Sequence, residues 1–351
     1  MNIKNNKISV VLPVYNGEKF ISDAINSILK QTHENFELII VNDCSTDSTS
    51  SIISRFATLD SRIKIITNSI NKKLPASLNI GHQSATGDYI TWTSDDNLYK
   101  PNAFETYLHH LQNSMSHIVY TDFDLINDNG QVLKRRNLSQ PEYLINGNCV
   151  GASFLYKREV YESLKGYNED LFLVEDYDFW LRAFVKFKFK YISESLYFYR
   201  SHVDSLSSQI GKNEEKYNLW IKNLSYMFQV FLTNYTTKAI PFSKVFTKQL
   251  THQPILLSEL LQNKKDFVLL IQNIVANDLL NKGNIKMALK EKLLQLLVSN
   301  PQKGATFKFS MFIVVNFWRE LKKNDIKTLI KYTFLKLFTQ GSLPLYAFYK
   351  I

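Results

Sequence analysis

The first two hundred residues alternate between short apolar runs and longer segments in which apolar residues recur every three or four positions. Short apolar runs are typical of buried strands, and the longer periodic segments of amphipathic helices. The predicted strands are Ile8–Pro13, Phe36–Val41, Ile63–Ile66 and Tyr89–Thr93. The predicted helices are Glu18–Lys30, 47–56, Leu74–Ala85 and 101–111. Strands that alternate with helices indicate an α/β fold with a largely parallel sheet.

The pattern becomes less regular beyond this repeat. Ile118–Ile126 and Gln131–Leu133 flank Asp128-Asn129-Gly130, which predicts a hairpin because Asn-Gly supplies the positive φ angles of a tight turn. Gly151–Tyr156 is a further predicted strand, and Phe187–Tyr199 is one strand or two. Between them, Glu175–Phe184 has the periodicity of a helix.

After about Ser208 the pattern is one of long helical segments, which predicts two domains at 1–208 and 209–351. The charge divides in the same way. The net charge is +10 overall, about −3 over 1–205 and about +13 over 206–351. This asymmetry predicts an anionic partner for the helical domain. We find no nucleic-acid-binding motif and expect no nucleic-acid partner, whereas a homo-oligomer is compatible with the composition.

No apolar run is long enough to predict a spanning helix. Phe307–Trp318 and Tyr332–Tyr349 are apolar segments interrupted by basic residues. They fit either helices in a membrane interface or ordinary helical packing, and the sequence favours neither. The polar first residues predict no signal peptide, and two cysteines suit a reducing compartment. We therefore expect a cytoplasmic protein, peripheral on the inner face of the cell membrane.

Acidic residues follow two of the predicted strands directly. Asp43 follows the second strand, and Asp95 and Asp96 follow Tyr89–Thr93. Ligands of parallel sheets bind at the carboxyl ends of the strands. No P-loop and no G-x-G-x-x-G after the first strand is present, so phosphate would be held through Mg²⁺ or Mn²⁺ on carboxylates. The alternative is that Asp95-Asp96-Asn97 only caps the next helix.

Eight segments in this order resemble family-2 glycosyltransferases, whose fold is GT-A, a Rossmann-like mixed sheet flanked by helices. They are 8–16, 41–49, Leu78-Asn79-x-Gly81, 85–90, Ser94-Asp95-Asp96-Asn97, 166–169, 175–182 and Tyr199-Arg200-x-His202. Together they span residues 8 to about 208. The remaining residues match no pattern that we can name.

The resemblance implies a site for a nucleotide-sugar donor. Pro13 and Tyr15 would line the nucleobase, and Asp43 would accept a hydrogen bond from the uracil or the ribose. Asn79 belongs to the same predicted donor site. Two positions depart from the family pattern: Cys44 replaces a glycine, and Ser94 replaces the first acid of Asp-x-Asp.

The resemblance also implies how the diphosphate is held. Asp96 would coordinate Mn²⁺ or Mg²⁺, with Asp95 and Ser94 beside the donor. Arg200 would face the diphosphate, and His202 would be a second metal ligand. Loss of the first acid to Ser94 would weaken the affinity for the metal.

By the same resemblance, Asp176 is the catalytic base. Sugar transfer with inversion requires a carboxylate that takes a proton from the attacking hydroxyl. The resulting prediction is an inverting hexosyl- or N-acetylhexosaminyltransferase of cell-surface polysaccharide biosynthesis. It would use a UDP-sugar, a glycan or lipid-linked acceptor and an anionic membrane surface. Two alternatives stay open: a nucleotidyltransferase, and a non-catalytic protein that binds UDP, glycan or membrane on a transferase scaffold.

Overall fold

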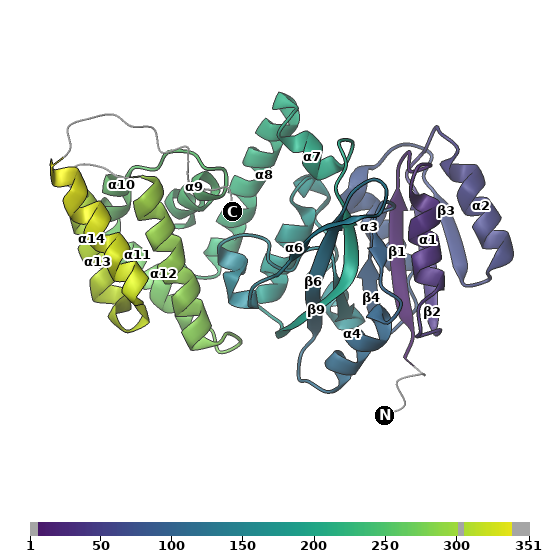
Figure 1. Ribbon diagram of the computed structural model, residues 1–351, viewed down its shortest axis with the longest axis horizontal. Helices are drawn as coiled ribbons and strands as arrows, with labels where there is room; N and C mark the ends of the chain where they lie inside the picture. The colour runs from purple at the N-terminus through teal and green to yellow at the C-terminus, as the bar shows by residue number, and fades with distance from the viewer. Residues whose placement is uncertain (1–5, 301–304, 339–351) are drawn as a thin grey trace. The chain divides into compact units, whose positions relative to one another are not determined.

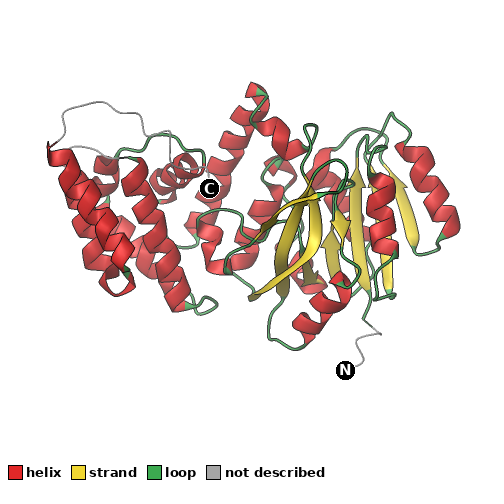
Figure 2. Cartoon of the chain, in the orientation of Figure 1, coloured by secondary structure: helices red, strands yellow, loops and turns green. Residues whose placement is uncertain are grey.

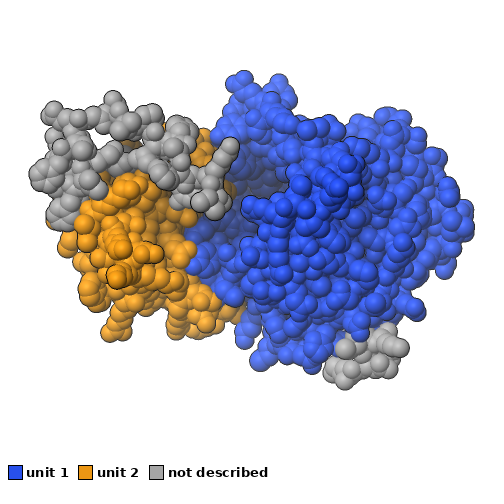
Figure 3. Space-filling model, viewed as in Figure 1, with its two compact units in different colours: residues 1–234 blue, residues 235–351 orange. Residues whose placement is uncertain are grey.

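The computed structural model describes residues 6–300 and 305–338, with side chains to Thr333 (Figure 1). The chain forms two compact units that divide after Asn234 (Figure 3). The sequence places this division near Ser208. The first unit is longer because α8 (Glu214–Thr233) packs against it: the ring of Phe228 meets that of Tyr177 at 5.8 Å, and Asn223 Nδ2 donates to the Phe172 carbonyl.

The first unit is built on one mixed sheet (Figure 2). Its strands are β1 (Ile8–Val14), β2 (Phe36–Asn42), β3 (Ile63–Thr67), β4 (Tyr89–Trp92), β5 (Leu98–Tyr99), β6 (Ile118–Ile126), β7 (Val132–Arg136), β8 (Phe154–Lys157) and β9 (Phe189–Arg200). They lie in the order β3-β2-β1-β4-β8-β6-β9-β5, with β7 beside β6. The first four strands are parallel, as predicted, and β5, β7 and β8 each pair antiparallel to their neighbours.

Helices cover both faces of the sheet. They are α1 (Ile21–Leu29), α2 (Thr49–Leu59), α3 (Lys73–Ser84), α4 (Ala103–Gln112), α5 (Arg158–Leu164), α6 (Glu175–Phe184) and the short α7 (Leu206–Ile210). Apolar residues of α1, α2 and α4 form one buried cluster with alternate residues of β1 and β2. On the opposite face α3 lies so close to the sheet that a Cβ at Gly81 would stand 2.3 Å from Val11 Cγ1.

The β6–β7 hairpin exists, but its turn differs from the predicted one. A tight Asn-Gly turn needs positive φ at both residues, and only Gly130 has it. Asn127 instead closes a wider loop: its N–H donates to the Gln131 carbonyl, and its side chain accepts from Gln131 N. The second strand then extends to Arg136. Strand β8 begins later than predicted, at Phe154, and the segment predicted as one strand or two is the single strand β9.

The second unit is helical, as predicted. Its helices are α9 (Ala239–Leu250), α10 (Leu257–Gln262), α11 (Lys264–Val275), α12 (Lys282–Ser299), α13 (Ala305–Phe317) and α14 (Lys323–Phe338). A buried ion pair joins Lys290 of α12 to Asp325 of α14 at 2.6 Å. Among the described residues, no helix has the length and apolarity needed to cross a membrane.

Helix α13 contains the apolar segment whose role the sequence leaves open. Phe309, Phe312, Ile313 and Phe317 are buried, so one face of α13 is ordinary core. The other face leaves Phe307, Met311 and Val315 exposed, and Trp318, in the 3-10 turn directly after the helix, is exposed as well. The second segment, Tyr332–Tyr349, lies mostly outside the described residues.

The sheet order creates the place for a ligand. The chain passes from β1 to β2 and β3 on one side and then returns to β4 on the other side of β1. The loops that follow β1 and β4 therefore lead in opposite directions, and ligands of such sheets bind at the carboxyl ends of the strands where this reversal occurs. The mixed sheet, its helical layers and the helical C-terminal unit confirm the predicted fold class.

Candidate active site

The loops after β1 and β2 are joined by hydrogen bonds at the carboxyl ends of the strands. Asn16 accepts from Thr46 N at its side-chain oxygen, and its own N–H donates to Ser45 Oγ. Gly17 N donates to Thr49 Oγ1 at the start of α2. These bonds hold the two loops as one rigid surface at the end of the sheet.

Asp43 is buried at the end of β2 and organises the next loop. Its Oδ1 accepts from Asn68 Nδ2 and Lys72 N at 2.8 Å each, and its Oδ2 accepts from Lys73 N at 2.9 Å. A carboxylate oxygen can accept two hydrogen bonds, so Oδ2 retains capacity for a ligand. Asp43 therefore shapes the predicted nucleobase site as well as lining it.

Tyr15 and Pro13 lie at the end of β1 and differ in exposure. Pro13 is buried within the strand, whereas Tyr15 is 51% exposed just beyond it. A half-exposed aromatic ring beside a buried carboxylate can stack on a flat base. The exposure of Tyr15 is thus the one expected of a stacking residue rather than of a core residue.

Asp95 lies against the β1 loop. A Cβ at Gly17 would stand 2.1 Å from Asp95 Oδ2, so only glycine permits this approach. Burial, with the neighbouring charges of Asp96 and Asp47, raises the pKa of Asp95 to about 7. Ser94 is half-buried beside it.

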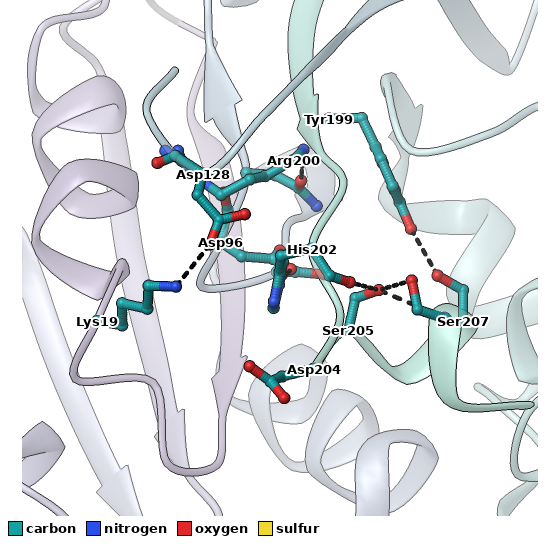
Figure 4. Close-up of polar contacts among 12 residues, drawn as sticks. Lys19, Asp96, Asp128, Tyr199, Arg200, His202, Asp204, Ser205 and Ser207 are labelled. Atoms are coloured by element: carbon teal, nitrogen blue, oxygen red, sulfur yellow. Dashed lines mark hydrogen bonds and ion pairs between the residues drawn. The ribbon is translucent and has the colours of Figure 1, made fainter. Parts of the chain in front are cut away.

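Asp96 and His202 come together as predicted (Figure 4). His202 Nε2 lies 2.9 Å from Asp96 Oδ2, and the imidazole packs edge-on against Phe20. Asp96 Oδ1 and His202 Nδ1 are buried without hydrogen-bond partners. Buried polar atoms without partners are costly in a folded protein, so this pair is prepared for a ligand.

Arg200 differs from the expectation that it faces the diphosphate. Its guanidinium is 2% exposed and donates to the main-chain carbonyls of Asp96, Asn127 and Asp128, while it stacks over the Phe20 ring at 4.3 Å. Arg200 therefore ties the Asp96 turn to the β6–β7 hairpin. Nearby, Lys19 pairs with Asp128 at 2.7 Å across the same edge (Figure 4).

Asp176 lies in the first turn of α6 and is held by a residue that the sequence analysis does not single out. Asn148 Nδ2 donates to Asp176 Oδ2 at 2.8 Å, and Tyr177 N donates to Oδ1 at 2.6 Å. Burial raises the pKa of Asp176. The adjacent Glu175 is buried with Oε2 unpartnered, and burial followed by the charge of Asp176 raises its pKa as well.

Asn79 also differs from its expected place in the donor site. Its Nδ2 donates to the Tyr167 carbonyl and to Glu169 Oε1, and its Oδ1 accepts from Tyr167 N. The amide is thus engaged in joining α3 to the turn at Gly166. This is a structural role within the unit.

Tyr199 is close enough to both acidic centres for their charges to act on its hydroxyl. Burial raises the pKa of its phenol, and the charges of both Asp96 and Asp176 contribute to the shift. Its hydroxyl shares a hydrogen bond with Ser207 Oγ at 3.1 Å (Figure 4). The charges of a candidate cation residue and of the candidate base thus both act on Tyr199.

Two residues that matter here are absent from the sequence-based site. Gly17 could have been recognised, because a glycine directly after a strand end often marks close backbone approach. Asn148 carries no such signal, since it lies in a loop far from Asp176 along the chain. Within the described residues, no three or more His, Cys, Asp or Glu side chains form a group that could hold a metal.

Comparison with known proteins agrees with this geometry. The family model described as glycosyl transferase family 2 matches residues 9–168. The putative glycosyltransferase EpsE of Bacillus subtilis is 35% identical over 208 residues, which cover 57% of this chain and 74% of EpsE. The uncharacterised glycosyltransferase RC0461 of Rickettsia conorii is 30% identical over 236 residues; the match covers 63% of this chain but only 38% of RC0461.

Solved structures show the same architecture. TarS residues 1–349 of S. aureus, crystallised with UDP-GlcNAc, superpose with a TM-score of 0.54 at 16% identity, over 93% of this chain and 90% of that one. At this identity the structural similarity shows the fold, which is GT-A. The matches to the family model and to the glycosyltransferase relatives show the activity, which is glycosyl transfer. The chain therefore belongs to glycosyl transferase family 2.

Proposed function

We propose that the enzyme transfers a hexosyl or N-acetylhexosaminyl group from a UDP-sugar, with inversion, to a hydroxyl of a glycan or lipid-linked acceptor in cell-surface polysaccharide synthesis. The unpartnered buried atoms of Asp96 and His202, together with the oriented carboxylate of Asp176, carry this proposal, because they supply a diphosphate-binding side and a base. The UDP-GlcNAc complex of TarS supports a UDP-sugar as donor.

Asp176 is the base in this proposal. Its ionised carboxylate takes the proton from the acceptor hydroxyl as that oxygen bonds to the anomeric carbon, and the diphosphate leaves with the electrons of the broken C–O bond. The pKa raised by burial makes Asp176 a stronger proton acceptor than an exposed aspartate. The hydrogen bond from Asn148 holds the carboxylate in one orientation.

The donor would lie along the ends of β1, β2 and β4. Tyr15 stacks on the uracil, Asp43 accepts from the base through Oδ2, and Pro13 shapes the wall. Asp95 and Ser94 lie at the β4 end, where a ribose would stand. The bonds that join the loops after β1 and β2 prepare this surface before the donor arrives.

Asp96 and His202 are the residues that would hold Mn²⁺ or Mg²⁺. The unpartnered Asp96 Oδ1 and His202 Nδ1 fit such a role. Two protein ligands suffice, because Mg²⁺ in phosphate sites usually completes its shell with water and phosphate oxygens. When bound, the cation would neutralise charge on the departing diphosphate. Arg200 supports this site by holding the Asp96 main chain.

The helical unit would bring the enzyme to the cytoplasmic face of an anionic membrane. Phe307, Met311 and Val315 recur at helical spacing on the exposed face of α13, and the exposed Trp318 follows directly after its end. On α14, the exposed Lys323, Lys327 and Lys331 alternate with the exposed Ile326 and Ile330. Apolar and basic residues together on exposed helix faces are typical of reversible interfacial binding.

The test is turnover and binding of UDP-sugars. A panel of UDP-sugars is assayed for hydrolysis and transfer with Mn²⁺ and with a chelator, and UDP is titrated by calorimetry under both conditions. We expect turnover of at least one donor and tighter UDP binding with Mn²⁺. Asp96→Ala should lose the effect of Mn²⁺ on binding. Equal affinity with metal and with chelator would contradict the metal part, and UDP binding without any turnover would contradict the transferase.

A further inference from the structure

Strand β7 is exposed along its whole length. All five residues from Val132 to Arg136 are solvent-exposed, including Val132 at 57% and Leu133 at 58%. Its one partner among the described strands is β6, so its outer edge is unpaired there. Three of the five residues are consecutive cations: Lys134, Arg135 and Arg136. None of the proposed catalytic residues lies on this strand, so its exposed cations have no role in the proposed chemistry.

The register shows which sheet face each cation occupies. Arg136 lies opposite Phe123 and Lys134 lies opposite Leu125, and residues directly opposite in a ladder share a face. Leu125 is in turn in register with Tyr199 of β9, and the rings of Phe123 and Tyr199 are 5.7 Å apart. Lys134 and Arg136 therefore border a half-buried apolar floor made of Phe123, Leu125 and Tyr199.

This floor leads to the proposed base. Phe123 Cε1 lies 3.0 Å from the point where a Cβ at Gly151 would stand. Gly151 belongs to the loop in which Asn148 accepts from the main chain and donates to Asp176. At its other end the floor reaches Tyr199, which is close to both Asp96 and Asp176. A molecule lying on the floor would thus reach the catalytic carboxylate.

The cations on this face are free for a ligand. Arg135, on the opposite face, pairs with Asp122 at 2.9 Å. Lys134 and Arg136 form no ion pair with any described residue, although the nearby site is rich in acids: Asp95, Asp96, Glu175 and Asp176. Successive residues on one face of a strand are roughly 6.8 Å apart, so the two cations can contact one phosphate or two neighbouring ones.

We infer that the acceptor carries phosphate groups and lies along β7, with Lys134 and Arg136 contacting phosphate while the sugar or polyol part rests on Phe123 and Tyr199. This inference rests on the proposed function, because it names the acceptor class of the same site. The phosphate can belong to a phosphodiester-linked glycan or to a lipid diphosphate headgroup. Lysine and arginine also discourage association of sheet edges, and the experiment must separate that role from binding.

The test compares charge removal on β7 with charge removal on another edge strand. The Lys134→Gln/Arg136→Gln double variant removes the proposed contacts. Lys64→Gln removes an exposed cation from β3, the edge strand at one end of the sheet. The probes are a synthetic oligo(glycerol phosphate), a short-chain prenyl diphosphate sugar, a neutral dextran oligomer and an oligogalacturonate. Binding is measured at low and high salt, with and without UDP and Mn²⁺.

We expect at least one phosphate probe to bind the parent protein more tightly than the neutral and carboxylate probes. The double variant should weaken that binding about tenfold or more, whereas Lys64→Gln should leave it unchanged. Binding of the glycerol phosphate oligomer alone assigns a glycan phosphodiester, and binding of the prenyl probe alone assigns a lipid headgroup. Equal binding by the double variant, no binding of either phosphate probe, or equal preference for carboxylate overturns the inference. The double variant should keep the UDP affinity of the parent protein. This measurement therefore tests the proposed transferase separately from the inference about its acceptor.

Discussion

Asn16, Cys44 and Lys73 hold positive φ angles around the proposed nucleobase site, at 55°, 64° and 72°. Each is joined to hydrogen bonds of the neighbouring loops, as in the bond from Lys73 N to Asp43 Oδ2. Left-handed backbone at residues other than glycine costs free energy, of the order of 1–3 kcal/mol where it is strained. Its accumulation here indicates that the loops are built to fix the orientation of a ligand.

Substitutions of Cys44 test whether the loop fixes this backbone conformation, because the family pattern has glycine at this position. Cys44→Gly should leave the free energy of unfolding within about 1 kcal/mol of the parent, because glycine adopts φ of 64° without strain. Cys44→Val should cost more, about 2 kcal/mol, since a β-branched residue is disfavoured at this φ. Urea unfolding of both variants measures this, and a valine variant as stable as the glycine one would show that the loop does not fix the conformation.

The second prediction at this scale separates the two acids at the start of α6. Asp176→Asn should lower turnover by a factor of about 10²–10⁴ with nearly unchanged UDP affinity, because the amide cannot accept the proton. Glu175→Gln should keep most of the activity, since burial and the charge of Asp176 hold Glu175 protonated and glutamine resembles that form. Steady-state kinetics of both variants decide the assignment, and the reverse pattern would make Glu175 the base.

Glu175 also makes the free energy of unfolding depend on pH, and this effect can be measured separately from catalysis. Its pKa is raised in the folded protein, so the folded state binds the proton more tightly than the unfolded chain. The resulting stabilisation is complete below the ordinary glutamate value and is lost as pH rises through the raised folded value. The unfolding free energy of Glu175→Gln should therefore decline less than that of the parent between pH 5 and 8. Parallel profiles in urea titrations would contradict the raised pKa.

At the scale of elements, Asn79 connects α3 to the turn before α6. Asn79→Ala would leave buried groups of Tyr167 without partners, which should destabilise the fold by about 1–3 kcal/mol. UDP affinity at a temperature where the variant is folded should stay near that of the parent. Asn137→Ala, at an exposed asparagine, serves as the control. A loss of UDP affinity without loss of stability would return Asn79 to the donor site.

The elements that sequence patterns predict best are strands that follow apolar runs. The first four strands agree with prediction to within a residue or two, and β1 and β2 are buried almost throughout. Prediction fails where polar side chains decide the structure. Asn127 closes the hairpin loop with its own side chain, and no apolar pattern reports that bond.

The proposed active site shows a similar contrast: the sequence motif predicts some side-chain positions, and the surrounding loops determine others. The motif brings Asp96 and His202 together, as expected. It does not reveal that Arg200 is buried among main-chain carbonyls, or that Asn148, from a distant loop, orients Asp176. These depend on which loops the sheet order brings to one edge, and that is a property of the whole unit.

At the scale of the whole molecule, charge and chemistry are divided between the two units. Acidic residues gather at the carboxyl ends of the strands in the first unit, and the excess of basic residues belongs to the helical one. A membrane surface carrying anionic lipid attracts each nearby cation by about 1 kcal/mol. The helical unit can therefore concentrate the enzyme at a membrane, while the first unit keeps its acidic residues at the proposed active site.

The last prediction tests that arrangement. The parent protein should co-sediment with liposomes containing anionic lipid at low salt and be released as salt screens the attraction. Replacing the exposed Lys322, Lys323, Lys327 and Lys331 with glutamine should weaken binding roughly a thousandfold, at about 1 kcal/mol for each lysine. The matched control replaces four exposed lysines of the first unit, Lys30, Lys64, Lys186 and Lys188, with glutamine. It should bind nearly as the parent does.

Trp318→Ala separates the apolar part of this binding, because Trp318 is 68% exposed and carries no charge. It should weaken binding by a similar factor at low and high salt, whereas the effect of the lysine replacements should vanish at high salt. If both sets of lysine replacements weaken binding equally, the attraction is a general effect of net charge rather than a property of α14. If the parent protein ignores anionic liposomes at low salt, the exposed faces of α13 and α14 do not bind membrane, and the basic surface must serve another anionic partner.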